Sequence, residues 1–497
     1  MASVLGRSPL PGSEEWQPAI LRARRERRIP DQDWTPIFLR SNLLTALTLL
    51  TVFLALQFLL PARLVLVGMG EAGRPSVAIG VLLAFLWLVS AVRGHLPAGR
   101  QPVRWAVGLF LLTQVVGNIV GFDRLATPGQ ASSADRWLIV TVGFVGVILA
   151  VTDGIRTRRE LDRLLRLLLF FASVMSVVGV LQFFGVADIT RYIQVPGLSV
   201  NYDLIAIGSR GDVGFSRVAG TANHYIEYGV VLALLLPLAL HYALFSPPGP
   251  TRWARWLTLG VIALGIPLSI SRAAVVTLGL VMILTGLVWT WRLRYNVLVL
   301  GLVAVSVFHV LNRGVLGTIR ALFTNAENDP SVTARVERTD TVLALFQQRP
   351  MLGWGAGMVT PGEFLLLDNQ VYMFLIAGGI VGVAAFLALF VVPYLLGRSV
   401  RLRGRDEQTR HLGHTLAVAM PTAVVVSGTF DSFSFATFVA TVSILIGAIG
   451  ALRRLDGTTV SRPLQTAAPG DAIVAEPLIL AWQGRRHPSR SPGKHRD

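Results

Sequence analysis

The chain has 497 residues, of which 53% are hydrophobic and only 15% are charged, whereas an average soluble domain carries about 25% charged residues. The apolar residues form about twelve blocks that approach the length needed to cross the roughly 30 Å hydrocarbon core of a bilayer. These blocks exclude a soluble enzyme and a receptor with a single membrane anchor. Cysteine is absent, which excludes disulfides, thiolate nucleophiles and cysteine-ligated metals.

The N-terminal segment is basic. Residues 1–40 are polar and contain no apolar core, so no cleavable signal peptide is expected. The net charge of the chain is +17, and a run of arginines precedes the first apolar block: Arg22, Arg24, Arg25, Arg27 and Arg28. By the positive-inside rule this run places the N-terminus in the cytoplasm. Anionic lipid headgroups explain such a segment better than nucleic acid does, so membrane lipids are the expected partner and nucleic acid is not.

Membrane spans are predicted, in chain order, over 43–60, 75–92, 105–121, 137–151, 164–184, 224–244, 256–270, 273–291, 296–311, 371–396, 412–428 and 435–452. Arginines gather in alternate connections, as expected for a cytoplasmic N-terminus, and an even number of spans returns the C-terminus to the cytoplasm. Residues 1–40 and 453–497 are expected to be disordered cytoplasmic tails. The predicted fold is therefore an all-α polytopic membrane domain over 41–452, with about twelve transmembrane helices.

Two segments on the predicted outer side, 185–223 and 312–367, are too long for simple connections and are expected to be functional. The first predicts a hairpin, with strands Leu198–Ile207 and Val213–Val218 around the turn Gly208–Asp212. The Arg-Gly-Asp sequence of this turn is also an adhesion tripeptide, but a turn needs no partner.

The second outer segment, a large loop between spans nine and ten, contains a helix signal. A helix is predicted after Pro330 with Ser331 as its cap, and Arg335 and Arg338 share one face of it. Three glycines near the end of the segment permit unusual backbone conformations; they are Gly353, Gly355 and Gly357. We expect the segment to act as a lid over a site on the outer side.

Three arginines near the predicted outer face are candidates for binding an anion. Arg272 interrupts an apolar stretch over 257–290, where a charge is costly unless it meets water or an anion. Its planar guanidinium matches phosphate oxygens, although an interfacial arginine can also reach lipid headgroups. Arg217 precedes the re-entry of the chain into the membrane and is either an anion ligand or a turn contact. Arg335 is either a third ligand or part of a solvated helix face.

Few acid–base candidates lie on the predicted outer side. Of the eight histidines, only His224 and His309 lie near it. Asp368 opens the tenth span and is either a helix cap or a general base, with burial raising its pKa. Glu227 and Asp431 are weaker candidates of the same kind. No group of residues has metal-ligand spacing and no Walker-type loop is present, so neither a metal nor another cofactor is expected.

A series of motifs follows in order along the chain: Arg217–His224, Glu227–Gly229, Ser271–Ala274, Ala334–Arg335, Pro350–Gly357, Asp368–Tyr372 and Gly378–Gly382. Together they resemble the O-antigen ligase and O-antigen polymerase superfamily of bacterial membrane glycosyltransferases. The motifs lie within 205–385. Each is weak alone, and the match depends on their order, spacing and predicted position outside the membrane.

This resemblance implies a GT-C-like helical fold and a metal-independent glycosyltransferase that inverts the anomeric centre. Members transfer glycans from a polyprenyl-diphosphate carrier to a glycan, lipid or protein acceptor at the outer face of the bacterial cytoplasmic membrane. Arg217 and Arg272 match the family's diphosphate-binding arginines, and Arg335 matches a third. The leaving diphosphate needs fixed cations more than it needs acid catalysis.

Asp368 departs from the family pattern, because ligases of this family usually have His at the position. Asp can still accept a hydroxyl proton, and an Asp-Asn pair such as Asp368–Asn369 also occurs in polymerase-like members. We therefore expect a surface polysaccharide polymerase or an O-antigen-ligase-like enzyme, with Asp368 or its rival His224 as the base.

A transporter, such as a flippase of lipid-linked sugars, is the main alternative. Transporters tend to show internal repeats and charged or broken helices near the bilayer midplane, whereas this chain shows no repeat of its halves and its charges gather at the outer face. A peptidoglycan-type glycan polymerase and a purely structural scaffold are further alternatives. A cavity under the 312–367 loop would favour transfer, and a path through the bundle would favour transport.

Overall fold

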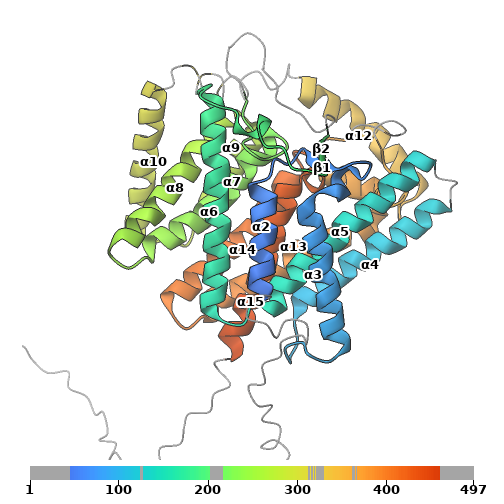
Figure 1. Cartoon of the computed structure of the whole chain (residues 1–497), viewed down its shortest axis with the longest axis horizontal. Coiled ribbons are helices and arrows are strands. Elements are labelled where there is room, and N and C mark those ends of the chain that lie inside the picture. Colours follow the sequence, from blue (N-terminus) through green and yellow to red (C-terminus); the bar gives the residue numbers. More distant parts are fainter. Residues whose placement is uncertain are drawn as a thin grey trace, which may run out of the picture. The chain divides into compact units, whose positions relative to one another are not determined.

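A computed structural model of the chain describes residues 45–123, 127–201, 217–311, 314, 317, 320, 330–360, 364 and 367–458. Thirteen α-helices lie in this described part (Figure 1). In chain order they are α2 (Ala46–Phe58), α3 (Pro75–Val92), α4 (Pro102–Phe122), α5 (Pro128–Gly154), α6 (Arg158–Phe183), α7 (Tyr225–Leu244), α8 (Pro250–Leu268), α9 (Arg272–Gly286), α10 (Trp291–Leu311), α12 (Pro330–Gln348), α13 (Gln370–Arg403), α14 (Glu407–Ser427) and α15 (Ala436–Thr458). Shorter elements are the strands β1 (Leu64–Leu66) and β2 (Leu198–Val200) and the 3-10 turns η2 (Gly70–Gly73), η3 (Ile189–Arg191) and η6 (Ser432–Ser434).

Eight of the described helices are long and apolar enough to cross a membrane: α3, α4, α5, α6, α7, α10, α13 and α15. Each predicted span falls on one helix, and the remaining helix, α12, lies in the predicted loop 312–367. The chain is therefore a polytopic all-α membrane protein, as predicted, while the number of spans and their orientation stay predictions. The predicted tail 1–40 and most of 453–497 lie outside the described residues, and α15 continues to Thr458.

Some helices begin at a local start signal that precedes the apolar block. α5 starts at Pro128, well before the predicted span 137–151, because Thr127 and Gln130 form a capping box. α3, α4 and α8 also begin with proline, whose fixed φ suits the first helical position. Local capping signals therefore decide the boundaries that hydropathy leaves open.

α7 and α15 form the centre of the bundle. In the apolar windows of these helices 89% and 94% of the residues are buried, against 6% in α10. Small residues permit this packing: a Cβ at Gly229 of α7 would lie 2.6 Å from Ala274 of α9, and one at Gly447 of α15 would lie 2.6 Å from Val151 of α5. Close approach through small residues is the usual way in which membrane helices associate.

β1 and β2 pair antiparallel, with Leu64 opposite Val200, and they mark one end of the bundle, called here the strand end (Figure 1). The sequence did not predict this pairing, in which the described part of the first hairpin strand lies beside a connection far away in the sequence. The rest of that hairpin, 202–216, lies outside the described residues. Thr221 fixes the same end, since its Oγ1 donates to the Phe58 carbonyl at 2.5 Å.

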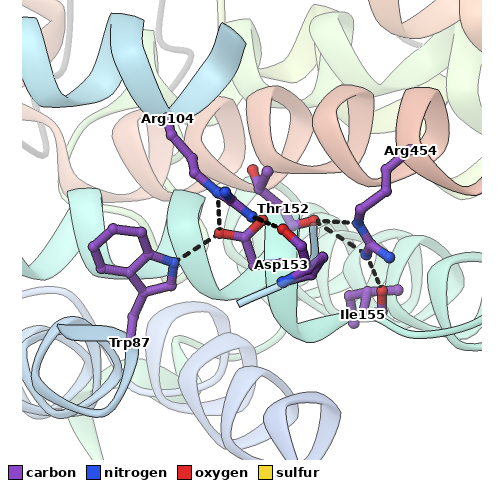
Figure 2. Close-up of polar contacts among 7 residues, drawn as sticks. Trp87, Arg104, Thr152, Asp153, Ile155 and Arg454 are labelled. Carbon is purple, nitrogen blue, oxygen red and sulfur yellow. Dashed lines mark hydrogen bonds and ion pairs between the residues drawn. The ribbon is translucent and has the colours of Figure 1, made fainter. Parts of the chain in front are cut away.

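At the opposite end, a buried aspartate joins several helices. Asp153 of α5 accepts a hydrogen bond from Trp87 of α3 at 2.7 Å and two from Arg104 of α4, each at 2.8 Å (Figure 2). Arg454 of α15 donates to backbone carbonyls at the end of α5. A bidentate pair fixes geometry as well as charge, so this cluster sets the positions of α3, α4, α5 and α15 relative to one another.

α13 is broken at Gly379, whose φ of +60° and ψ of −157° are not helical. A break exposes backbone groups that must find partners in apolar surroundings. Segment 350–355 supplies them through backbone hydrogen bonds of 2.8 to 3.2 Å: two N–H groups of the segment donate to α13 carbonyls before the break, and two N–H groups after the break donate to carbonyls of the segment. The described end of the predicted lid is therefore anchored on α13.

Gly379→Ala should destabilise the protein, whereas Gly378→Ala should not. A non-glycine residue in this backbone region, which is essentially restricted to glycine, costs roughly 1–3 kcal/mol. A Cβ at Gly379 would also lie 2.5 Å from the backbone of Met351, while one at Gly378 meets open space. Thermal unfolding in detergent should occur at a lower temperature for Gly379→Ala alone. Equal unfolding temperatures for the two variants would contradict the role given to the break.

Candidate active site

Arg272 begins α9 directly after a strained turn. Ile270 has a φ of +45° although its side chain is β-branched and buried, and this conformation is rare for such a residue. The Oγ of Ser271 accepts the N–H of Ala274 at 3.4 Å and caps the helix. Strain of this kind persists only where the surroundings impose it, and it is concentrated at functional sites. The turn therefore marks the half-buried Arg272 as a functional candidate.

Beyond Arg272, α9 presents an uncovered apolar stripe. Val276, Ile283 and Leu287 are exposed, and a Cβ at Gly279 would meet open space. These positions follow Arg272 at spacings of three and four residues, which lie on one face of a helix. The arginine thus stands at the head of a stripe that lipid chains can reach.

Arg217, His224 and Tyr225 form a cluster at the start of α7. The guanidinium carbon of Arg217 lies 4.4 Å from the centroid of the Tyr225 ring, which is a cation–π contact. The His224 ring lies 4.0 Å from the same ring, and its Nδ1 accepts the N–H of Ile226 at 3.1 Å. Burial, and then the charge of Arg217, lower the pKa of His224 to about 4. His224 is therefore neutral at pH 7, with its proton on Nε2.

The two arginines come from neighbouring helix starts. Gly229 near the start of α7 touches Ala274 in the first turn of α9, since a Cβ added to the glycine would lie 2.6 Å from that of the alanine. Arg217 lies just before α7, and Arg272 heads α9. The predicted diphosphate arginines are therefore at the same end of the bundle, one before α7 and the other at the start of α9.

Glu227 links this region to α15. Its fully buried carboxylate accepts the N–H groups of Thr437 at 2.5 Å, Phe438 at 3.2 Å and Asn223 at 2.8 Å. A carboxylate at a helix N-terminus satisfies N–H groups that lack partners within the helix and interacts favourably with its dipole. Glu227 thus fixes the start of α15 against the start of α7, and its oxygens are occupied by backbone donors.

Asp368 precedes α13 but does not cap it. The cap is Asn369, whose Oδ1 accepts the N–H groups of Val371 at 2.9 Å and Tyr372 at 3.2 Å. The alternative in which Asp368 is the cap is therefore wrong, because its neighbour occupies that position. The Asp368 carboxylate is half-buried, and its charge contributes to raising the pKa of Asp431.

A cavity of about 300 Å³ opens at the strand end between α4, α5 and the start of α13. It is completed by η2, by residues 356–360 of the predicted lid and by the turn 431–434. Glu71, Arg136 and Asp431 bring charge to it. Of these only Asp431 is a candidate from the sequence. Glu71 and Arg136 both lie in short predicted outer connections, and this position is the signal that the sequence gives for each of them.

The carboxylates of this cavity influence one another. The pKa of Asp431 is raised to about 7, mainly by burial and also by the charges of Glu71 and Asp368. A hydrogen bond from Ser434 opposes this rise. Burial also raises the pKa of Glu71, against the nearby charge of Arg74. Perturbed pKa values in a cleft are typical of functional sites. Within the described residues, no three His, Asp or Glu side chains are arranged to hold a metal ion.

Arg335 lies in α12, but its side chain lies outside the described part of the chain. α12 begins at Pro330, so Ser331 is inside the helix and does not cap it, contrary to the prediction. Proline takes the first position because its missing N–H would have no partner there. Further along, Val342 is buried in a small hydrophobic cluster with Ile376 of α13, which holds α12 against the start of that helix.

Residues 257–387 match the family model described as O-antigen ligase. This segment of the chain is therefore similar to the O-antigen ligase family. The match confirms the resemblance inferred from the motifs, and the matched segment includes Arg272, Arg335 and Asp368, while Arg217 precedes it. The O-antigen ligase family consists of glycosyl-transferring enzymes that act on lipid-linked glycans and acceptors. A comparison with curated proteins gives no match.

Glu227→Gln should destabilise the protein. Both carboxylate oxygens accept backbone N–H groups, and glutamine would replace one of them with a donor. A buried donor without an acceptor costs about 1–3 kcal/mol, so thermal unfolding in detergent should occur at a lower temperature. Glu160→Gln is the matched control, because one oxygen of Glu160 accepts the N–H of Arg156 at 2.7 Å and an amide oxygen can replace it. An equal shift in both variants would contradict the role of Glu227.

Proposed function

We propose that this protein transfers or polymerises glycan units from a polyprenyl-diphosphate-linked donor at the outer face of the bacterial cytoplasmic membrane. The observation that carries the proposal is the position of Arg272, which follows a strained turn within the segment similar to the O-antigen ligase family and heads an apolar stripe. In this proposal the helical fold is of the GT-C type and the strand end faces outward. Both termini lie in the cytoplasm, which agrees with the arginine-rich connections.

Arg272 and Arg217 bind the donor diphosphate, and Arg335 is the third ligand. Guanidinium forks match phosphate oxygens and stabilise the negative charge that develops on the leaving lipid diphosphate. This role requires neither a metal ion nor another cofactor. The lipid part of the donor lies along the exposed face of α9 (Val276, Ile283 and Leu287), which supports a lipid-linked donor over a soluble one.

Transfer takes place in one displacement that inverts the anomeric carbon. The acceptor hydroxyl attacks that carbon, the bond to the diphosphate oxygen breaks, and the hydroxyl proton passes to a base. We assign the base to Asp368. His224 suits the role less well, because its Nδ1 already accepts a backbone N–H and its pKa is lowered. The Nε2–H of His224, beside Arg217, is instead placed to donate to an anionic ligand.

A transporter of lipid-linked sugars receives less support. α7 and α15 in the centre of the bundle are almost fully buried. The cavity of about 300 Å³ opens instead at the strand end, beside residues 356–360 of the predicted lid. A cavity of this kind favours transfer, in which donor and acceptor meet at one face of the membrane.

Arg272→Lys tests the donor site. Liposomes that hold the purified wild type and lipid-linked oligosaccharide should release polyprenyl diphosphate; glycan lengthened on the carrier would indicate a polymerase, and glycan moved to another acceptor a ligase. Lysine keeps the charge but loses the fork, so release should fall about 100-fold or more.

Arg191→Lys is the matched control, because Arg191 forms an exposed ion pair with Asp188 at the strand end; it should release the product at the wild-type rate. Full release of polyprenyl diphosphate by Arg272→Lys would contradict a role for this arginine in donor binding. No release by the wild type would reject the proposed function.

Asp368→Asn should lower transfer about 100-fold or more, because it keeps the size of the side chain but removes the base. The pH profile separates His224 from Asp431 as the base, since a base works only when unprotonated. A His224 base would lose activity as the pH falls through about 4, and an Asp431 base as it falls through about 7. Wild-type turnover by Asp368→Asn together with inactivity of His224→Ala would assign the base to His224.

A further inference from the structure

The cavity between α4, α5 and α13 contains a buried donor without an acceptor. Gln370, the first residue of α13, lines the cavity and is fully buried. Its Oε1 accepts the N–H of Phe433 at 2.7 Å, whereas its Nε2 has no hydrogen-bond partner among the described residues. Buried polar groups in proteins are normally paired. A ligand in the cavity is the group that can accept a hydrogen bond from this amide.

The other lining residues supply acceptors, donors and aromatic surface. The carboxylates of Glu71 and Asp431 accept hydrogen bonds, and the guanidinium of Arg136 donates them. Trp137 donates its Nε1–H to Oε1 of Gln114 at 3.0 Å, which fixes the indole ring as part of the wall. The cavity therefore offers both hydrogen-bonding polarities beside a fixed aromatic side chain.

This combination selects a neutral compound that carries hydroxyl groups. A hydroxyl both donates and accepts, so neighbouring hydroxyls can satisfy the carboxylates and the Gln370 amide at once. An anion would lie against the carboxylates of Glu71 and Asp431, and a cation against Arg136. A volume of about 300 Å³ is at the lower limit of ligand pockets, which suits a single sugar residue.

We propose that this cavity, called here the Gln370 cavity, binds a neutral sugar residue of a glycan acceptor. The acceptor role rests on the proposed function. Asp368, the proposed base, precedes Gln370 by two residues. Asp431 lines the cavity, and at the other side of the same turn the ring of Phe435 lies 5.6 Å from that of His224. A sugar in the cavity therefore lies near the proposed base, and the turn 431–434 separates it from the cluster of Arg217, His224 and Tyr225.

Two variants test the Gln370 cavity without using catalysis as the readout. Gln370→Glu keeps the oxygen that accepts from Phe433 and replaces the free N–H donor with an acceptor. Gly378→Leu fills the cavity from α13, where an added Cβ meets open space. Gly108→Leu is the matched control, because Gly108 is also a helical glycine with open space around it, on the exposed surface of α4.

Saturation-transfer NMR on the full-length protein in nanodiscs measures the binding of three probes: methyl glycosides of a hexose, a 6-deoxyhexose and an N-acetylhexosamine. The wild type and Gly108→Leu should bind at least one of them. Gln370→Glu and Gly378→Leu should bind it roughly tenfold more weakly, as expected when a buried hydrogen bond or the space itself is lost. Unchanged binding in either cavity variant, or no binding by the wild type, would overturn the sugar site.

Release of polyprenyl diphosphate by the same preparations separates this inference from the proposed function. Release without glycoside binding would leave the donor function intact and reject the Gln370 cavity as a sugar site. Glycoside binding that depends on Gln370, without release from lipid-linked oligosaccharide, would reject the transfer function and the acceptor role with it.

Discussion

Backbone groups at a helix end inside an apolar bundle have no water to bind, so the chain must supply their partners. Three such places are completed by segments distant in the sequence. Glu227 accepts hydrogen bonds from backbone N–H groups at the start of α15. Segment 350–355 bonds the backbone groups on both sides of the break of α13 at Gly379. Arg454 donates to a backbone carbonyl at the end of α5. Each of these contacts joins a helix to another part of the chain, and together they help to position α5, α7, α13 and α15.

These hydrogen bonds help to determine the geometry of the candidate site. The start of α7, held by Glu227, carries the cluster of Arg217 and His224, and the neighbouring start of α9 carries Arg272. The break in α13 brings the end of the predicted lid against this helix, where residues 356–360 form a wall of the cavity. Arg217 and Arg272 therefore lie near the starts of α7 and α9, whereas Asp368 and Asp431 lie at the start of α13 and in the turn before α15. Arg136 is the cationic residue of the cavity wall on this second side.

This separation of charge suits two ligands of different chemistry. An anionic, lipid-linked group fits the arginine side, where the exposed face of α9 connects Arg272 with the bilayer. A neutral polyhydroxyl group fits the carboxylate side, where Gln370 has a free donor. Asp368 lies close to the second side, since its charge acts on Asp431 in the cavity wall. In the proposed function, Asp368 is the base and lies where an acceptor would lose its proton.

The sequence by itself determined the helices and the charges that matter. A membrane helix satisfies its own backbone, so apolar blocks indicate its position, and a charge such as Arg272 is conspicuous in apolar surroundings. Tertiary structure decided which carboxylates meet, bringing Glu71 to Asp431, and which side chains serve as caps, giving that role to Asn369 and not to Asp368. These choices depend on contacts between segments far apart in the chain or on backbone angles, and neither exists until the helices have packed.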